Sequence, residues 1–207
     1  DFATNQGGDL LNLWSEVRGY GKSEFPRLLA EINEWLGNSP ISPTIRENRI
    51  VRKSPPIDTL GKPSKSWNYF DQNNRLSAVV YRYDNESGKQ FRIWDVKNMK
   101  SQAPKIRPLY NIPGILSSKK VIIVEGEKSA DALIEKGFCA TTAMCGANAP
   151  LEKTDWSYLK DKEVIIWPDN DEAGINYANK LAEYLSGKCS FISVLSPPEG
   201  KKDKRSE

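Results

Sequence analysis

The spacing of hydrophobic residues changes twice along the chain, and each change predicts a different kind of structure. Near the N-terminus, Leu10–Val17 and Phe25–Leu36 carry apolar residues at helical spacing, which predicts a helical segment over residues 1–37. Residues 38–66 are rich in proline and serine and have neither a helical nor a strand period, so a linker is expected there. The first residue is Asp1 rather than methionine, and we expect a piece of a longer protein.

A strand pattern occupies residues 67–118. Leu76–Tyr83 is rich in β-branched and aromatic residues, a polar turn follows it, and Gln90–Val96 alternates apolar and polar side chains. This arrangement predicts a hairpin, or a three-stranded meander if Trp67–Phe70 also pairs. The expected unit is a small, basic, strand-rich subdomain.

Residues 119–196 alternate short apolar runs with helical patterns. Runs that are apolar throughout are typical of parallel strands buried on both faces. Four strands are expected, at Val121–Val124, Cys139–Met144, Val164–Trp167 and Ser190–Leu195. Two helices are expected between them, at Ser129–Lys136 and Ala173–Leu185, and a short helix or turn is expected at Trp156–Leu159. The prediction is an α/β fold with a parallel sheet flanked by helices, followed by a mobile tail over residues 197–207.

The composition excludes several kinds of chemistry. The 207 residues contain no histidine, which rules out Ser-His-Asp and Cys-His catalysis and histidine-ligated zinc. The three cysteines form no CxxC pair, so a reducing cytoplasm is expected rather than a disulfide scaffold. No apolar run reaches the roughly 18–20 residues of a membrane span, and no membrane contact is expected. Any catalysis must therefore use carboxylates, lysines, backbone amides or a cation held by oxygen atoms.

Positive charge is concentrated in the middle of the chain. Residues 41–120 carry 16 basic and 6 acidic side chains, whereas the segments on either side are net acidic. A segment this basic predicts a polyanionic partner, although lysines also solubilise loops. Its cationic and aromatic side chains interleave, which is typical of proteins that bind single-stranded nucleic acid. The expected DNA-binding residues are Arg75, Arg82, Lys89, Arg92, Lys97, Lys100, Lys105 and Arg107. The interleaved aromatic residues could stack on bases or form one buried face: Tyr69, Tyr81, Tyr83, Phe91 and Trp94.

Acidic residues follow two of the predicted strands at their carboxyl ends. Glu125 comes directly after the first strand, and Asp169 and Asp171 come after the third. Ligands bind at the carboxyl ends of strands in open parallel sheets, and neighbouring strands would bring these carboxylates together. Three carboxylates around one cleft suit Mg²⁺ or Mn²⁺, because both cations prefer oxygen ligands. The alternative is that Glu125 and Asp171 each serve the N-terminus of a helix.

Three further residues lie near this expected cleft. Lys128 follows Glu125 closely and could neutralise phosphate charge, or it could simply be solvated. Gly146 and Asn148 lie in a loop after the second predicted strand, where backbone amides could meet a phosphate or a ribose. We predict that these three residues contact a nucleotide.

The acidic motifs resemble the Toprim domain of topoisomerases and primases. The resemblance rests on Glu125-Gly126 after one buried strand and on Asp169-x-Asp171-x-x-Gly174 after another. The stretches EGEKSADAL and WPDNDEAG are most similar to primases of the phage and plasmid type.

The flanking regions extend this resemblance. Residues 67–112 resemble the strand-rich region that precedes Toprim in those primases, and residues 1–37 resemble the helical end of their zinc-binding domain. The zinc ligands of that domain and the GxxxxGK[ST] motif of a helicase are both missing from this sequence. We therefore expect a chain truncated before its zinc-binding motif, with no zinc and no helicase domain of its own.

The resemblance implies the catalytic core of a DNA primase, which makes short RNA primers on single-stranded DNA from nucleoside triphosphates. It implies that Asp169 and Asp171 hold Mg²⁺ and that Glu125 is a further ligand or a general acid or base. It also implies a replicative helicase as partner, in the cytoplasm of a bacterium that could carry the gene on a phage or plasmid. Two alternatives stay open: a Toprim nuclease that cuts phosphodiesters with the same acids, and a non-catalytic module that binds nucleoside triphosphates and DNA.

Overall fold

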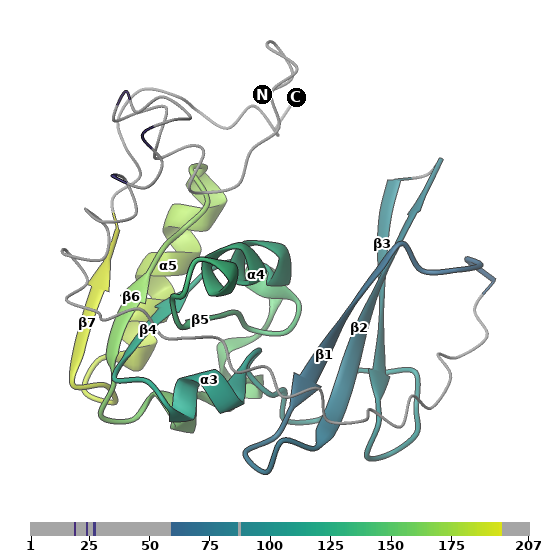
Figure 1. The fold of residues 1–207 in the computed structure, drawn as a ribbon, viewed down its shortest axis with the longest axis horizontal. Coiled ribbons are helices and arrows are strands. Elements are labelled where there is room, and N and C mark those ends of the chain that lie inside the picture. Colours follow the sequence, from purple (N-terminus) through teal and green to yellow (C-terminus); the bar gives the residue numbers. More distant parts are fainter. Residues whose placement is uncertain (1–18, 20–23, 25–26, 28–58, 87, 196–207) are drawn as a thin grey trace.

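The structure is a computed structural model, and it describes residues 19, 24, 27, 59–86 and 88–195. The described residues contain two β-sheets, which are drawn side by side in Figure 1. Most of the predicted N-terminal helical segment, the linker as far as residue 58 and the predicted C-terminal tail lie outside the described residues. Among the described residues, no helix is long and apolar enough to cross a membrane.

The first sheet is an antiparallel meander of three strands. β1 (Lys65–Phe70), β2 (Leu76–Asn85) and β3 (Gly88–Asp95) pair in that order, so the predicted hairpin has its three-stranded form. Asn74 adopts a left-handed conformation (φ 58°) in the turn between β1 and β2, and Gly88 (φ 102°) does so after the turn between β2 and β3. These two positions let short turns join long neighbouring strands.

The second sheet is parallel and has four strands, which confirms the predicted α/β fold class. Its strands lie in the order β5 (Ala140–Thr141), β4 (Lys120–Ile123), β6 (Glu163–Ile166) and β7 (Phe191–Val194). The strand predicted at Cys139–Met144 is shorter than expected, because only two of its residues pair with β4. Beyond them the chain turns to another neighbour: Ala143 forms an antiparallel bridge with Leu109.

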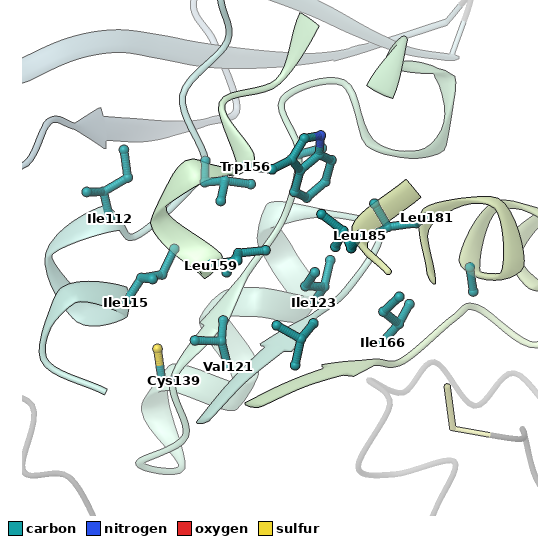
Figure 2. Close-up of a cluster of buried hydrophobic side chains, with 14 of the residues drawn as sticks. Ile112, Ile115, Val121, Ile123, Cys139, Trp156, Leu159, Ile166, Leu181 and Leu185 are labelled. Atoms are coloured by element: carbon teal, nitrogen blue, oxygen red, sulfur yellow. The ribbon is translucent and has the colours of Figure 1, made fainter. Parts of the chain in front are cut away.

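Helices cover both faces of the parallel sheet (Figure 1). α4 (Glu127–Glu135) packs on one face, over Ile122, whereas α5 (Glu172–Leu185) and α3 (Ile112–Leu116) pack on the other, over Ile123. Adjacent strand residues point to opposite faces, so continuous apolar runs are needed to fill both cores. Figure 2 shows the larger core, on the α5 side.

The sequence pattern predicted one short element, the helix or turn at Trp156–Leu159, and missed the others. The α3 helix was not predicted; Asn111 begins it and accepts a hydrogen bond from the backbone N–H of Gly114. Three 3₁₀ turns follow β5 along the chain: η2 (Gly146–Asn148), η3 (Leu151–Lys153) and η4 (Trp156–Leu159).

The two sheets share a hydrophobic cluster. Trp67, Tyr69 and Val80 of the antiparallel sheet pack with Met144, which comes from the chain after β5. Tyr110 joins the same cluster, and its ring meets that of Tyr69 edge to face with the ring centroids 5.3 Å apart. The antiparallel sheet is therefore packed directly against the side of the parallel sheet where β5 lies.

Candidate functional site

The carboxyl ends of β4 and β6 bring Glu125 and Asp169 together. The two strands are parallel neighbours, so the residues that follow them leave the sheet at the same edge. Oε1 of Glu125 accepts a hydrogen bond from the backbone N–H of Asp169 at 3.0 Å. Burial raises the pKa of Glu125, the Asp169 N–H opposes this shift, and the charges of Asp169 and Asp171 raise the pKa further. Glu125 therefore lies close enough to Asp169 and Asp171 to be repelled by their charges.

Two glycines allow this close approach. A Cβ atom on Gly174 would overlap the Glu125 carboxylate and would lie 2.7 Å from the carbonyl oxygen of Asp169. A Cβ atom on Gly146, whose φ is +56°, would lie 2.5 Å from the carbonyl oxygen of Glu125. Glu125 is thus enclosed by the start of α5 on one side and by the η2 loop on the other, and neither contact leaves room for a side chain.

Asp171 has a structural role as well as its place among the acids. It is the N-cap of α5, and its Oδ1 atom accepts a hydrogen bond from the Gly174 N–H at 2.7 Å. The capping interpretation therefore holds for Asp171. It does not hold for Glu125, because α4 is capped by Gly126 without a side-chain hydrogen bond. A capping carboxylate uses one oxygen for the helix and keeps further acceptor capacity.

The acids do not form a closed metal cage. Among the described residues, no three acidic, cysteine or histidine side chains are grouped so that they could hold a metal ion. The chemistry of the donors nevertheless fits a divalent cation, because carboxylate oxygens are the ligands that Mg²⁺ and Mn²⁺ prefer. Glu125 also experiences repulsion from two neighbouring carboxylates, which a bound cation would relieve.

The residues predicted to contact a nucleotide lie around the same edge of the sheet. Lys128 is exposed in the first turn of α4. Gly146 begins the η2 turn against the backbone of Glu125. The side chain of Asn148 lies outside the part of the chain that the structure describes. Lys128 is thus close to Glu125 along the chain, and Gly146 lies against the backbone of Glu125.

Arg107 is a half-buried cation near the η2 loop. Burial raises the pKa of the Cys145 thiol, and the nearby charge of Arg107 partly opposes this shift, so Arg107 lies on the side of the residue that precedes η2. Its backbone is fixed by hydrogen bonds to Lys153 and Asp155. The Nε atom of Arg107 is buried without a hydrogen-bond partner. Arg107 thus combines a fixed backbone with an unused donor.

The other predicted DNA-binding residues do not form a single row of cations. Arg82 pairs across the sheet with Phe91, whereas Arg92 pairs with Tyr81, so the two arginines point to opposite faces. Arg82 is also bound to Asp84, with Nη2 and Oδ1 2.7 Å apart. Five lysine and arginine side chains in turns and strand ends are exposed: Arg75, Lys89, Lys97, Lys100 and Lys105.

Most of the interleaved aromatic residues belong to the core. Tyr69, Tyr81 and Tyr83 are buried on the two faces of the antiparallel sheet, which favours the buried-face interpretation over base stacking. Phe91 differs from them, because 49% of its surface is exposed.

Two acids of α4 were not singled out by the sequence analysis. Glu127 and Asp131 lie one helical turn apart and accept hydrogen bonds from Tyr69 and Trp67 of β1. The spacing of the two acids was visible in the sequence, but nothing in the sequence places β1 beside α4.

Comparison with known proteins assigns the parallel sheet. Residues 120–196 match the Toprim domain family. An uncharacterized protein of Mycoplasma genitalium, MG010, is 28% identical over 90 residues, which cover 43% of this chain and 41% of that protein. The region that matches this family contains the parallel sheet and the acids that follow β4 and β6.

Two solved structures are similar in shape over 66% of this chain. One is the catalytic core of DnaG (TM-score 0.44, 18% identity), and the other is the catalytic core of the E. coli primase (TM-score 0.42, 16% identity). The matched region covers 45% of each of those chains. This chain therefore spans less than half the length of the proteins that it matches.

Proposed function

We propose that this chain is the nucleotidyl-transfer core of a primase, which joins nucleotides into a short RNA primer on single-stranded DNA. The observation that carries the proposal is the edge of the Toprim sheet, where Glu125 is held against Asp169 and beside Asp171. The same edge carries Lys128 and the η2 loop, which supply a cation and a tight backbone turn for a triphosphate.

Asp169 and Asp171 would hold Mg²⁺ or Mn²⁺, and Glu125 would either complete the ligand set or accept and return a proton. The cation would supply charge neutralisation at the phosphates and activation of the attacking hydroxyl. Gly174 leaves room for the Glu125 carboxylate, and Gly146 leaves room for the backbone carbonyl of Glu125, so both glycines let Glu125 lie at this edge.

The residues outside the acidic edge would bind the substrates. Lys128 and Arg107 would attract the triphosphate, since one is exposed beside Glu125 and the other has an unused buried donor near η2. The template would be bound by the exposed lysines and arginines of residues 75–105. A replicative helicase is the protein partner that we propose.

A primer-synthesis assay tests the proposal. The 207-residue chain is incubated with a single-stranded DNA template, labelled nucleoside triphosphates and Mg²⁺, and the products are separated by length. We expect extension by the unmodified chain and a loss of at least about 100-fold in Asp169→Asn. Asp161→Asn is the matched control, because Asp161 is exposed in the turn before β6, at the opposite end of the strand that Asp169 follows.

The assay also separates the two alternatives. Cutting of the template in place of extension would establish a Toprim nuclease and overturn the proposal. Binding of DNA and nucleotide without either product would establish a non-catalytic module. Equal loss in Asp169→Asn and Asp161→Asn would show that the acidic edge is not the reacting site.

A further inference from the structure

A set of hydrogen bonds joins the antiparallel sheet to the helix that follows Glu125. Tyr69 donates from its hydroxyl to Oε1 of Glu127 at 2.7 Å, and Trp67 donates from Nε1 to Oδ2 of Asp131 at 2.8 Å. The hydroxyl of Tyr110 donates to Oδ1 of Asp131 at 2.7 Å. The three contacts connect residues 58, 64 and 21 positions apart in the sequence, so they depend on the tertiary fold rather than on local structure.

The two elements match in spacing. Trp67 and Tyr69 are two residues apart on β1, which is about 6.6 Å along a strand and places both side chains on one face. Glu127 and Asp131 are four residues apart on α4, which is about 6 Å along the helix and also places them on one face. Because the two spacings agree, both donors reach their acceptors together, and a shift of α4 along its axis would break both hydrogen bonds.

These contacts lie next to the candidate cation site. Glu127 is the first residue of α4, and Gly126 alone separates it from Glu125. Nothing lies within 4 Å of the place where a Cβ atom of Gly126 would be, so no packing holds this residue on that side. The junction is instead fixed at its two ends: Glu125 is bound by the Asp169 N–H, and Glu127 is bound by the Tyr69 hydroxyl.

The burial of the donors makes this second anchor stiff. Tyr69 has no exposed surface and Trp67 has 4%. The Tyr69 ring is packed in the cluster that joins the two sheets, so its hydroxyl occupies a fixed position at the end of α4. The anchor on Glu127 is therefore provided by the antiparallel sheet and not by the Toprim domain itself.

We propose that Tyr69 and Glu127 are positioning residues for the cation site. The antiparallel sheet, through the Tyr69 hydroxyl, holds the start of α4 where the Glu125 carboxylate can meet Asp169 and Asp171. The sheet thus acts on the cation site although it supplies no ligand. This inference rests on the proposed function, in which Glu125 takes part in cation binding.

Cation affinity is the readout that tests this inference. Tb³⁺ is titrated into the 207-residue chain, its luminescence is excited through tryptophan, and Mg²⁺ is then used to displace it. Trp167 lies two residues before Asp169, so its indole is a suitable sensitiser. We expect Tyr69→Phe to weaken both Tb³⁺ and Mg²⁺ binding by about three- to tenfold, which corresponds to the loss of one hydrogen bond.

The matched control is Tyr158→Phe. Tyr158 also donates from its hydroxyl to the antiparallel unit, to Oε1 of Gln72 in the turn between β1 and β2 at 2.8 Å, but it belongs to η4 and not to α4. We expect this variant to bind Tb³⁺ and Mg²⁺ like the unmodified chain. Equal weakening in both variants would show a general loosening of the structure and would overturn the inference.

A double-mutant cycle checks that Tyr69 acts through Glu127. In a chain that already carries Glu127→Ala, adding Tyr69→Phe should weaken cation binding no further, because the hydrogen bond is already absent. Additive effects would overturn the inference. If the unmodified chain binds neither cation, the proposed cation site itself fails; if it binds both and Tyr69→Phe binds them equally well, only the positioning role fails.

Discussion

The two sheets of this chain differ in whether charged residues on neighbouring strands come together. In the parallel sheet, residues that follow β4 and β6 meet at one edge, so Glu125 and Asp169 are brought together across 44 positions of sequence. In the antiparallel sheet, residues on paired strands can be separated by the pleat, so Arg82 and Arg92 face opposite sides. Charged residues that follow neighbouring parallel strands therefore predict a shared site. Charged residues within antiparallel strands do not by themselves predict which side chains lie on the same face.

The largest effect that would sharpen this comparison concerns Asp171, which both caps α5 and belongs to the acidic edge. We expect Asp171→Asn and Asp171→Ala each to lower primer synthesis by at least about 100-fold, because both remove the charge. Asparagine still caps a helix, so only Asp171→Ala should lower the free energy of unfolding, by about 1 kcal/mol. Thermal unfolding without added cation measures the difference. Full activity in Asp171→Asn would reduce Asp171 to a cap alone.

The next effect concerns the space around Glu125. We expect Gly174→Ala to lower the free energy of unfolding by about 2 kcal/mol and to weaken Tb³⁺ binding, because its Cβ atom would meet the Asp169 backbone and the Glu125 carboxylate. Gly126→Ala is the control, since nothing lies near its Cβ position and its φ of −150° is open to any residue. Denaturant titration measures both variants, and equal stability would show that the acidic edge is loosely packed.

A smaller effect concerns the basic side of the comparison. Lys97 and Lys100 are exposed after β3, and replacing both with alanine should weaken binding of single-stranded DNA. The log–log salt slope should flatten by about 1.4 units, since each phosphate contact on a single strand contributes about 0.7. The control is the double variant Arg82→Ala with Asp84→Ala, which removes a bound pair without changing net charge. A slope that changes only in this control would place the template on the Arg82 side of the sheet.

The smallest expected effect is on how the stability of the fold changes with pH through the ion pair between Arg82 and Asp84. Hydrogen bonds from Arg82 and Ser64 lower the pKa of Asp84. Because the pKa is lower in the folded than in the unfolded chain, the pair stabilises the fold above the ordinary carboxyl pKa, and this contribution is lost as the pH falls through the lower folded value. The free energy of unfolding of Asp84→Asn should therefore depend slightly less on pH in the acid range than that of the unmodified chain. Asp84 is exposed, so a large change would be contrary to expectation.

The sequence predicted the parts of the site that depend on topology. Apolar runs identify parallel strands, and the carboxyl ends of such strands are where ligands bind, so Glu125 and Asp169 could be placed together from spacing alone. The short β5 could not be predicted, because Ala143 leaves the sheet to bridge Leu109, and that partner is set by tertiary packing. The same limit applies to Glu127, whose partner Tyr69 lies on another sheet.

The charge pattern was informative in a different way. The composition showed that the segment is basic, but it could not show the ion pair between Arg82 and Asp84. A positive and a negative charge within three residues do not by themselves predict that the two side chains pair. The aromatic residues left two interpretations open, and burial decides between them for Tyr69 and Tyr83. Hydrophobic alternation in a strand of a small sheet cannot say which face will be covered by another part of the chain.

The cluster drawn in Figure 2 bears on which length of chain can fold alone. Leu109, Ile112 and Ile115 have almost no exposed surface and fill the core beneath α5, yet they precede the first strand of the parallel sheet. A fragment of residues 120–196 would lack these three core residues, and we expect it to lose several kcal/mol of stability. The shortest fragment expected to keep this core therefore starts before Leu109, in the segment that leads out of the antiparallel sheet.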